Sequence, residues 1–187
     1  NQKDNIFRRQ KTKMSENTSK WMKELDDDLY LNEINLPGTH DTCAYHCIIF
    51  AKCQNRSLSE QLNAGIRYID IRCRHKGDTF RLHHAQINLR LEFDKDVQDV
   101  CIDFLKQNPS ETIVMLIKQE YTPKNNQKRF DEVLHNYIRD YTADYWHLEE
   151  KVPRLGDVRG KIVLLRRFES AIRPLGIDMT GNFSILS

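Results

Sequence analysis

The sequence predicts an α/β fold in which βα units build a parallel, barrel-like sheet. Segments with the apolar alternation of strands take turns along the chain with segments of helical period, and this order is typical of βα units. Each of the five strands that we expect also ends directly on polar or charged residues. Functional sites of barrels gather at the carboxyl ends of the strands, so this pattern predicts the place of a site. With 187 residues, the chain is long enough for one domain.

Charge and hydropathy limit the possible functions. Hydrophobic residues make up 39% of the chain and charged residues 30%, as in a globular protein. No apolar run approaches the ~18 residues of a membrane span. Residues 1–20 are expected to form a basic tail, either disordered or weakly attracted to anionic lipid, and residues 21–187 to form the domain. Because the remainder of the chain is slightly acidic, a nucleic-acid partner is not expected.

A histidine and an aspartate follow the first expected strand. Residues 29–36 lead into this strand, and the Pro37-Gly38 turn is expected to end it. His40 and Asp41 come directly after the turn. Histidine is the side chain whose ordinary pKa lies nearest neutrality, so this pair is a candidate for proton transfer.

Capping, periodicity and apolar runs predict the other elements. Ser57 and Glu60 fit a capping box at the start of a short helix that Gly65 ends. Asp94 is the expected N-cap of a helix that ends at Asn108-Pro109. The remaining expected elements are a short helix near residues 21–25, strands at residues 66–73, 79–84, 112–117 and 162–165, and a helix at residues 130–141.

The cysteines do not predict a metal site. The five are Cys43, Cys47, Cys53, Cys73 and Cys101. They include no CxxC pair, and no matching Cys/His pair follows, so a structural zinc is not expected. An odd number of cysteines cannot all pair within one chain, and the disulfide state and compartment stay open.

Strand alternation selects the side chains that can converge. Asp70 and Arg72 share one face of their strand, and we interpret this charged face as lining a polar site. In the next strand His84, rather than the preceding histidine, shares a face with Phe80 and Leu82, which we take as the inward face. Later strand ends add Lys118, Glu120 and Arg167.

Two imidazoles and an arginine suit the cleavage of a phosphodiester. One imidazole can take a proton from the nucleophile, and the other can give a proton to the leaving alkoxide. A guanidinium between them can hold the phosphate oxygens in a bidentate fork and stabilise the transition state. Each residue also has a plainer interpretation: His40 as a structural turn residue, the pair His83-His84 as metal ligands, and Arg72 as a salt-bridged barrel residue.

Several stretches resemble the X domain of phosphatidylinositol-specific phospholipase C in its bacterial-type form. They are residues 36–42 (LPGTHDT), 61–72 (QLNAGIRYIDIR), 82–84 (LHH), 108–114 (NPSETIV), 118–121 (KQEY) and 160–168 (GKIVLLRRF). The resemblance extends from about residue 21 to residue 168, and its specificity lies in the order and spacing of these stretches. It implies an irregular (β/α)8, TIM-barrel-like fold. This chain would hold its N-terminal part, about five strands, in a domain truncated at the C-terminus.

The resemblance also implies an activity and roles for residues. The activity is cleavage of phosphatidylinositol into diacylglycerol and inositol 1,2-cyclic phosphate. By position, His40 matches the general base, His84 the general acid, Asp41 the carboxylate paired with that acid, and Arg72 the phosphate-binding arginine. The implied substrate contacts are Lys118, Arg167, Asp70 and Glu120. No metal or cofactor is expected, because Arg72 stands where calcium-dependent relatives carry an acidic ligand.

Two other functions stay open: cleavage of glycosylphosphatidylinositol anchors, and a non-catalytic module that binds lipid or inositol phosphate. The expected partners are an inositol lipid and a membrane surface engaged peripherally, with residues 48–50 as a candidate docking segment. A secreted or peripheral-membrane location is expected, and the oligomeric state stays open. We also expect the carboxylate that orients His40 to lie beyond residue 187, and the fifth strand to leave an open edge or one covered by a partner segment.

Overall fold

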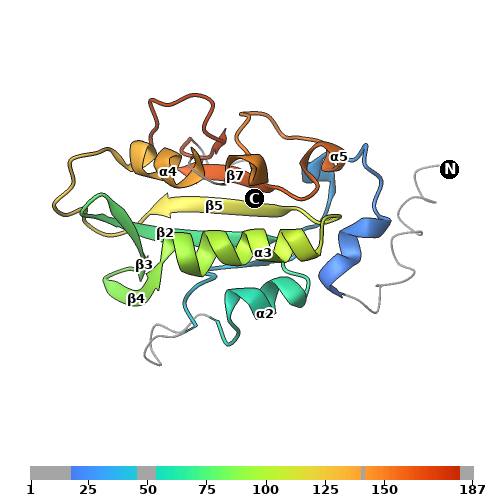
Figure 1. Cartoon of the computed structure of the whole chain (residues 1–187), viewed down its shortest axis with the longest axis horizontal. Coiled ribbons are helices and arrows are strands. Elements are labelled where there is room, and N and C mark those ends of the chain that lie inside the picture. Colours follow the sequence, from blue (N-terminus) through green and yellow to red (C-terminus); the bar gives the residue numbers. More distant parts are fainter. Residues whose placement is uncertain (1–17, 46–53, 140–141, 182–187) are drawn as a thin grey trace.

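The computed structural model describes residues 18–45, 54–139 and 142–181, which form an open sheet with helices packed on it (Figure 1). The strands are β1 Gly38–Thr39, β2 Tyr68–Lys76, β3 Thr79–His84, β4 Ile87–Glu92, β5 Ile113–Gln119, β6 Trp146–His147, β7 Ile162–Arg167 and β8 Ile177–Asp178. The helices are α2 Leu58–Asn63, α3 Asp99–Gln107, α4 Phe130–Arg139 and α5 Leu155–Val158, with helical turns η1 Thr18–Glu24, η2 Leu31–Glu33, η4 Asp94–Gln98 and η5 Ala143–Tyr145. The candidate docking segment at residues 48–50 and most of the basic tail lie outside the described residues.

The sheet has the order β4-β3-β2-β5-β7-β6, with β1 paired to β2 and β8 paired to β7. The pairings β1–β2, β2–β5, β5–β7, β6–β7 and β7–β8 are all parallel, and the β3–β4 hairpin extends the sheet in antiparallel fashion. Within the described residues β1 pairs with neither β6 nor β8, so the sheet is only partly barrel-like. The predicted α/β, incomplete barrel-like fold is confirmed.

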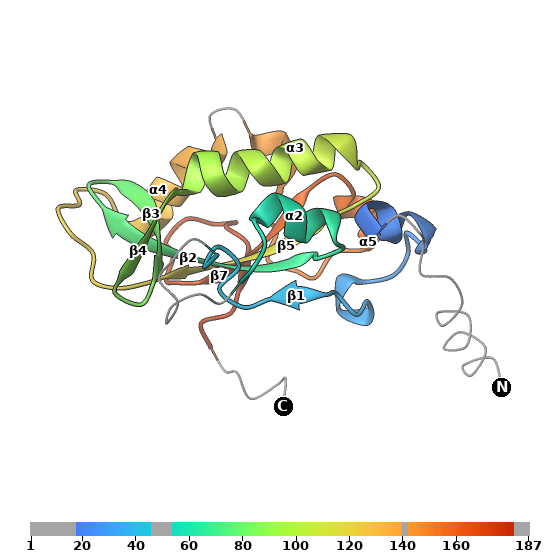
Figure 2. The ribbon, with the colours of Figure 1, turned by 90° about the horizontal axis from the view of Figure 1, so that it is seen from below.

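One face of the sheet packs against helices α2, α3 and α4 (Figure 2). Ile69 and Ile71 of β2 and Met115 of β5 are fully buried there, together with Phe104 and Leu134 from the helices. Burying an aliphatic side chain of this size contributes about 1.5–3 kcal/mol relative to leaving it exposed. The larger apolar cluster of the described residues therefore lies on this face.

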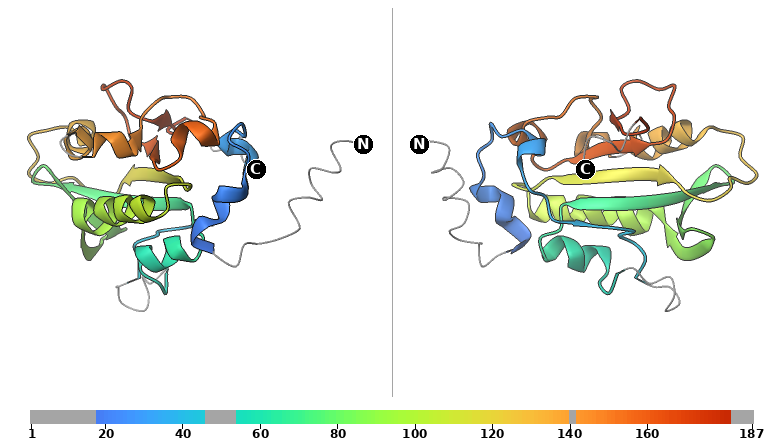
Figure 3. Two further views of the ribbon diagram at one scale, coloured as in Figure 1. Left: turned by 45° about the vertical axis from the view of Figure 1, so that its right-hand side comes forward. Right: turned by 180° about the vertical axis from the view of Figure 1, so that it is seen from behind.

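The opposite face changes from apolar to charged along the strands. Three rows lie in register across β2, β5 and β7: Tyr68, Val114 and Val163, then Asp70, Leu116 and Leu165, and last Arg72, Lys118 and Arg167. A second apolar cluster around Met22, Leu155 and Val158 closes the end where the strands begin. There η1 lies beside α2 and α5 (Figure 3). The charged row is left at the carboxyl ends of the strands, as predicted from the strand endings.

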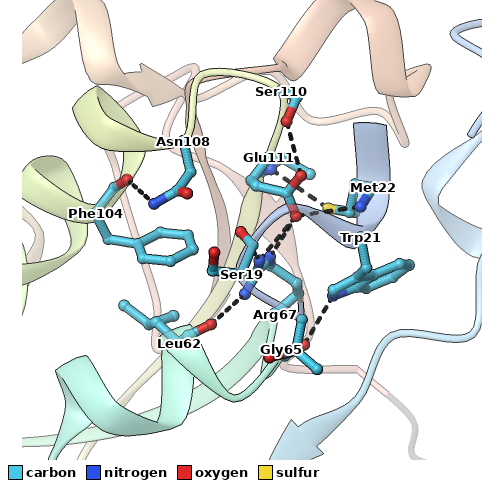
Figure 4. Close-up of polar contacts among 12 residues, drawn as sticks. Ser19, Trp21, Met22, Leu62, Gly65, Arg67, Phe104, Asn108, Ser110 and Glu111 are labelled. Atoms are coloured by element: carbon cyan, nitrogen blue, oxygen red, sulfur yellow. Dashed lines mark hydrogen bonds and ion pairs between the residues drawn. The ribbon is translucent and has the colours of Figure 1, made fainter. Parts of the chain in front are cut away.

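A buried ion pair joins four elements at the closed end (Figure 4). Arg67 and Glu111 are both fully buried, and Arg67 Nη2 lies 2.8 Å from Glu111 Oε2. The guanidinium also donates to the carbonyls of Leu62 and Ile66 at 2.7 Å each and of Ser19 at 2.8 Å. This one side chain therefore connects η1, α2, the start of β2 and the loop before β5.

Two expectations about the early strands are wrong. The Pro37-Gly38 segment does not end the first strand, because the Pro37 carbonyl accepts the N–H groups of Arg67 and Tyr68 at 2.9 and 3.1 Å and Gly38 enters the sheet. Residues 79–84 form a strand, but it runs antiparallel to β2. The cause is the turn at Gly77-Asp78, where both residues have positive φ, 60° and 54°, and reverse the chain directly.

Other expected details are partly confirmed. The Ser57–Glu60 capping box is present, and α3 ends before Asn108 as predicted. Asp94 is not an N-cap, because the backbone is already helical at Phe93 and a π-turn precedes α3. The expected open edge of β7 is not found within the described residues. Segments of the same chain pair with it, β6 with its first residues and β8 with its last.

No helix within the described residues is long and apolar enough to span a membrane.

Candidate active site

The candidate site forms where two strands meet on one edge of β2. β1 pairs in parallel with the first residues of β2, and β3 pairs in antiparallel fashion with its last residues, Cys73–Lys76. The two strands therefore approach each other along the same edge, and their carboxyl ends meet beside the middle of β2. His40 and Asp41 follow β1, and His84 ends β3. The antiparallel direction of β3, which the sequence analysis missed, is what brings His84 to the site.

Arg72 is the centre of the cluster. Its Nε lies 3.0 Å from Asp41 Oδ1, its Nη2 donates to Asp70 Oδ2 at 3.1 Å, and its Nη1 lies 3.9 Å from Glu120 Oε1. The same Nη2 lies 2.7 Å from His40 Nε2. Burial alone would lower the pKa of Arg72, but the carboxylates of Asp70, Asp41 and Glu120 together raise it above its ordinary value. The guanidinium is therefore a fixed cation inside the site.

Asp41 links the two halves of the site. It is 3% exposed and has the left-handed φ of 47°, and its N–H donates to Asp70 Oδ2 at 3.2 Å. One carboxylate oxygen faces Arg72 and the other lies 3.2 Å from His84 Nε2. Burial raises the pKa of Asp41 above its ordinary value, although Arg72 and His84 act in the opposite direction.

The two imidazoles meet opposite charges. A guanidinium is only a hydrogen-bond donor, so His40 Nε2 accepts the hydrogen bond from Arg72 Nη2. His84 Nε2 lies 3.2 Å from Asp41 Oδ2, within ion-pair distance when the ring is protonated. One ring therefore faces a cation and the other an anion.

The other predicted residues line the rim beside this cluster. Lys118 Nζ lies 2.9 Å from Glu120 Oε2, and the other oxygen of that carboxylate, Oε1, lies 3.9 Å from Arg72 Nη1. Arg167 lies in register with Lys118 on the neighbouring strand and is exposed. Burial and Asp70 raise the pKa of the Tyr68 phenol, and Arg167 lies close enough to oppose this shift. All eight predicted residues therefore lie on one rim.

His84 lies at the site as predicted, but not because it shares a site-facing side of its strand with Phe80 and Leu82. Phe80 and Leu82 do not line the site, because they belong to the core under the helices. His83 is the more buried of the two histidines, at 2% exposure, and stacks on Tyr121 with ring centroids 6.1 Å apart. His84 reaches Asp41 because the end of β3 meets the end of β1.

Three polar residues that hold the His40–Asp41 turn were not predicted. Gln61 of α2 donates to the Thr42 carbonyl at 2.9 Å and accepts from the Thr39 hydroxyl at 2.8 Å. Thr42 Oγ1 accepts the N–H of Asp70 at 2.8 Å, and Gln54 donates to the His40 carbonyl at 2.7 Å. Gln61 was recognisable from its place between Leu58 and Leu62, on the apolar face of its helix.

A metal-ligand cluster is not present among the residues that the structure describes. The carboxylates of Asp41, Asp70 and Glu120 all face the guanidinium of Arg72. The cation that these three carboxylates surround is therefore the guanidinium of Arg72.

By its fold and site, the protein belongs to the class of barrel-like α/β proteins that carry histidine, aspartate and arginine at the carboxyl ends of their strands. Comparison with family models then identifies the family within this class. Residues 30–168 match the model of the phosphatidylinositol-specific phospholipase C X domain, and the chain belongs to this family.

Bacterial proteins are among its relatives. A 1-phosphatidylinositol phosphodiesterase from Listeria monocytogenes is 40% identical over 178 residues, which cover 89% of this chain and 54% of that protein. A crystal structure of a phosphatidylinositol-specific phospholipase C variant from Staphylococcus aureus aligns with a TM-score of 0.80 at 30% identity, over 87% of this chain and 57% of that one. Another Staphylococcus aureus structure, from work on modulation of the enzyme's membrane binding, aligns with a TM-score of 0.79 at 29% identity over the same shares. The chain spans about half the length of these relatives.

Proposed function

We propose that this chain supplies the catalytic rim of a phospholipase C that cleaves phosphatidylinositol. The observation that carries the proposal is the position of Arg72, which contacts His40 directly and His84 through Asp41. A phosphate bound to this guanidinium would lie between a proton acceptor and a proton donor. Family membership and the names of the bacterial relatives support the same substrate class.

The proposed reaction is an internal displacement at phosphorus. His40 takes the proton of the inositol 2-hydroxyl, and the resulting oxygen forms a bond to phosphorus. The bond from phosphorus to the diacylglycerol oxygen breaks, and His84 gives its proton to that oxygen. The products are diacylglycerol and inositol 1,2-cyclic phosphate. Nucleophile and phosphorus share one molecule, so much of the entropic barrier is already overcome.

Asp41 and Arg72 assist this reaction in different ways. Asp41, beside His84 Nε2, stabilises the imidazolium of His84 before its proton is given away. Arg72 binds the non-bridging phosphate oxygens and stabilises the charge that grows on them. Lys118, Arg167, Asp70 and Glu120, on the same rim, would contact the hydroxyl groups of the inositol ring.

The proposed enzyme does not need a metal ion. Calcium would require several oxygen ligands, and the nearest carboxylates already bind Arg72, which supplies the positive charge. Excess EDTA should therefore leave the rate on phosphatidylinositol unchanged. Loss of activity with EDTA that added calcium restores would contradict this part of the proposal.

The substrate lies in a bilayer, so the proposed enzyme acts peripherally on a membrane surface. The work on membrane binding of the Staphylococcus aureus relative supports this partner. The chain spans about half the length of the relatives that it matches. Activity is therefore best measured on the full-length protein.

Phosphorus NMR of the products from phosphatidylinositol vesicles tests the reaction directly. The proposal predicts a resonance of inositol 1,2-cyclic phosphate, which identifies both the bond that breaks and the nucleophile. The double variant His40→Ala with His84→Ala should produce none. Formation of phosphatidic acid, or binding of vesicles by the unmutated protein without any turnover, would contradict the proposal.

A further inference from the structure

A cavity lies on the other face of β2 from the candidate active site. Its volume is about 410 Å³, and its walls include His75, Gln119, Lys124, Asn126, Lys128 and Phe130. His75 faces away from Arg72 because side chains alternate along a strand. The cavity is nevertheless at the same end of the sheet, since His75 and Gln119 belong to the last residues of β2 and β5.

His75 lies in the wall of this cavity, and its Nε2 is buried. The residue is 3% exposed, and its Nε2 has no hydrogen-bond partner within the part of the chain that the structure describes. The Asp78 carboxylate is 3.7 Å from Nε2, too far for a hydrogen bond. The ring is held by edge-to-face contacts with Phe80 and Phe130, at centroid distances of 5.7 and 5.9 Å. A buried polar atom without a partner is unfavourable, so a ligand that supplies the partner would be favoured at this position.

The charges around His75 favour an anion. Lys124 and Lys128 line the cavity, and Lys76 pairs with Lys124 through a backbone bridge. Asp78 Oδ1 accepts hydrogen bonds from the backbone N–H groups of Gln127 and Lys128, each at 2.9 Å. These two donors partly neutralise the negative charge of the Asp78 carboxylate. Burial lowers the pKa of His75 and the Asp78 carboxylate offsets this only in part, so the ring is neutral at pH 7 and can donate one hydrogen bond.

We propose that this cavity is an accessory site for a phosphate group, carried either by a soluble polyol phosphate or by the headgroup of an anionic lipid. The two lysines would bind the charge of the phosphate. His75 would bind an oxygen atom, as would the second N–H of the Asn126 side-chain amide, whose nitrogen already donates to the His75 carbonyl at 3.0 Å. Lysine ammonium groups and charge-assisted hydrogen bonds are common in phosphate sites. The proposal does not depend on the catalytic assignment, because none of these residues belongs to the candidate active site.

NMR titration with inorganic phosphate and with inositol 1-phosphate tests the site. The expected result is a saturable shift of the His75 ring resonances and of the Lys124 amide. The double variant Lys124→Gln with Lys128→Gln should weaken binding about tenfold, equivalent to about 1.4 kcal/mol. The control variant Lys23→Gln with Lys151→Gln removes the same charge from exposed positions elsewhere. It should change the affinity for phosphate less than twofold. His75→Gln is a second probe, but the lysine pair decides the test if this buried variant does not fold.

Vesicle sedimentation separates the two sources of phosphate. Vesicles of phosphatidylcholine alone are compared with equimolar mixtures of phosphatidylcholine and phosphatidylglycerol. If the lysine variant loses affinity for the mixed vesicles beyond the charge-matched control, the occupant is a lipid headgroup. If only binding of soluble phosphate is lost, the occupant is soluble. If phosphate does not shift His75, or if both lysine pairs weaken binding equally, the proposal is wrong.

Discussion

Arg67 and Arg72 lie on the same stretch of chain, and their surroundings differ in almost every respect. Arg67 is fully buried at the closed end of the sheet, with one carboxylate and three carbonyls as acceptors. Arg72 has a side chain 17% exposed and is surrounded by three carboxylates and an imidazole. Burial lowers the pKa of Arg67, whereas the carboxylates raise that of Arg72.

We interpret the difference as that between a structural arginine, Arg67, and the proposed phosphate-binding arginine, Arg72. Carbonyls around Arg67 belong to several elements, so its hydrogen bonds hold those elements together. Around Arg72 there are more negative charges than one guanidinium needs, and one of its nitrogens contacts a second ionisable group. Such an arrangement stabilises the fold weakly but fixes the direction of each hydrogen bond, which is what a phosphate site requires.

The largest expected effect is on stability, at Arg67. Arg67→Ala leaves Glu111 as a buried charge without a partner, and breaking a buried pair in this way costs about 3–5 kcal/mol. Urea unfolding measures the loss. Replacing both residues, Arg67→Met with Glu111→Leu, should restore part of the stability, and an unchanged midpoint for Arg67→Ala would contradict the structural assignment.

The second effect is on catalysis, at Arg72. Arg72→Ala should lower kcat on phosphatidylinositol by about 10²–10³-fold, the cost of removing one donor that stabilises the transition state. The unfolding midpoint should fall less than for Arg67→Ala, since the Arg72 side chain is 17% exposed and Asp41, whose pKa is already raised by burial, can take up a proton. Steady-state kinetics beside urea unfolding separates the two effects. If Arg72→Ala lowers the unfolding midpoint as much as Arg67→Ala does, the proposed difference between the two arginines is wrong.

A smaller effect is expected at Gln61, which supports the site from α2. Gln61→Leu keeps the size of the side chain but leaves the Thr42 carbonyl and the Thr39 hydroxyl without their partner. We expect a loss of about 1–2 kcal/mol in stability. We also expect kcat to fall more than KM changes, because Asp41 and His40 lose their support. Asn63→Leu, on the exposed side of the same helix, is the control.

The smallest effect concerns the pH dependence of stability through Asp41. Because burial raises the pKa of Asp41, the folded protein holds the proton more tightly than the unfolded chain. The stabilisation from this proton is full below the ordinary pKa of aspartate and is lost as the pH rises through the folded value. Asp41→Asn, which resembles the protonated form, should therefore gain stability over the wild type at pH 7 and lose that advantage near pH 3. An advantage independent of pH would contradict the burial argument.

Local signals in the sequence predicted local structure well. The Ser57–Glu60 capping box and the end of α3 depend on neighbouring residues, and both are present. The apolar run of β5 also predicted a strand buried on both faces. Long-range pairing was harder, because nothing near residues 146 or 177 indicated that two short segments would pair along β7.

The position of the candidate site could be predicted because it depends on where the strands end. Its residues follow strand ends, and strand ends of a parallel sheet meet at one rim. The direction of β3 was missed although the Gly77-Asp78 turn indicated a hairpin, and the central position of Asp41 could not be foreseen. Its left-handed backbone and its burial depend on contacts with Asp70 and Arg72, which only the folded chain brings together.

Lysine replacement of each arginine, with kcat and unfolding free energy measured on both variants, tests the central claim most directly. Lysine keeps the charge and loses the planar fork. We predict that Arg72→Lys lowers kcat by about 10²-fold and leaves the free energy of unfolding within about 0.5 kcal/mol of the wild type. Arg67→Lys should lose stability and keep kcat in the fraction that is folded. Full activity of Arg72→Lys, or an equal loss of stability in both variants, would contradict the account.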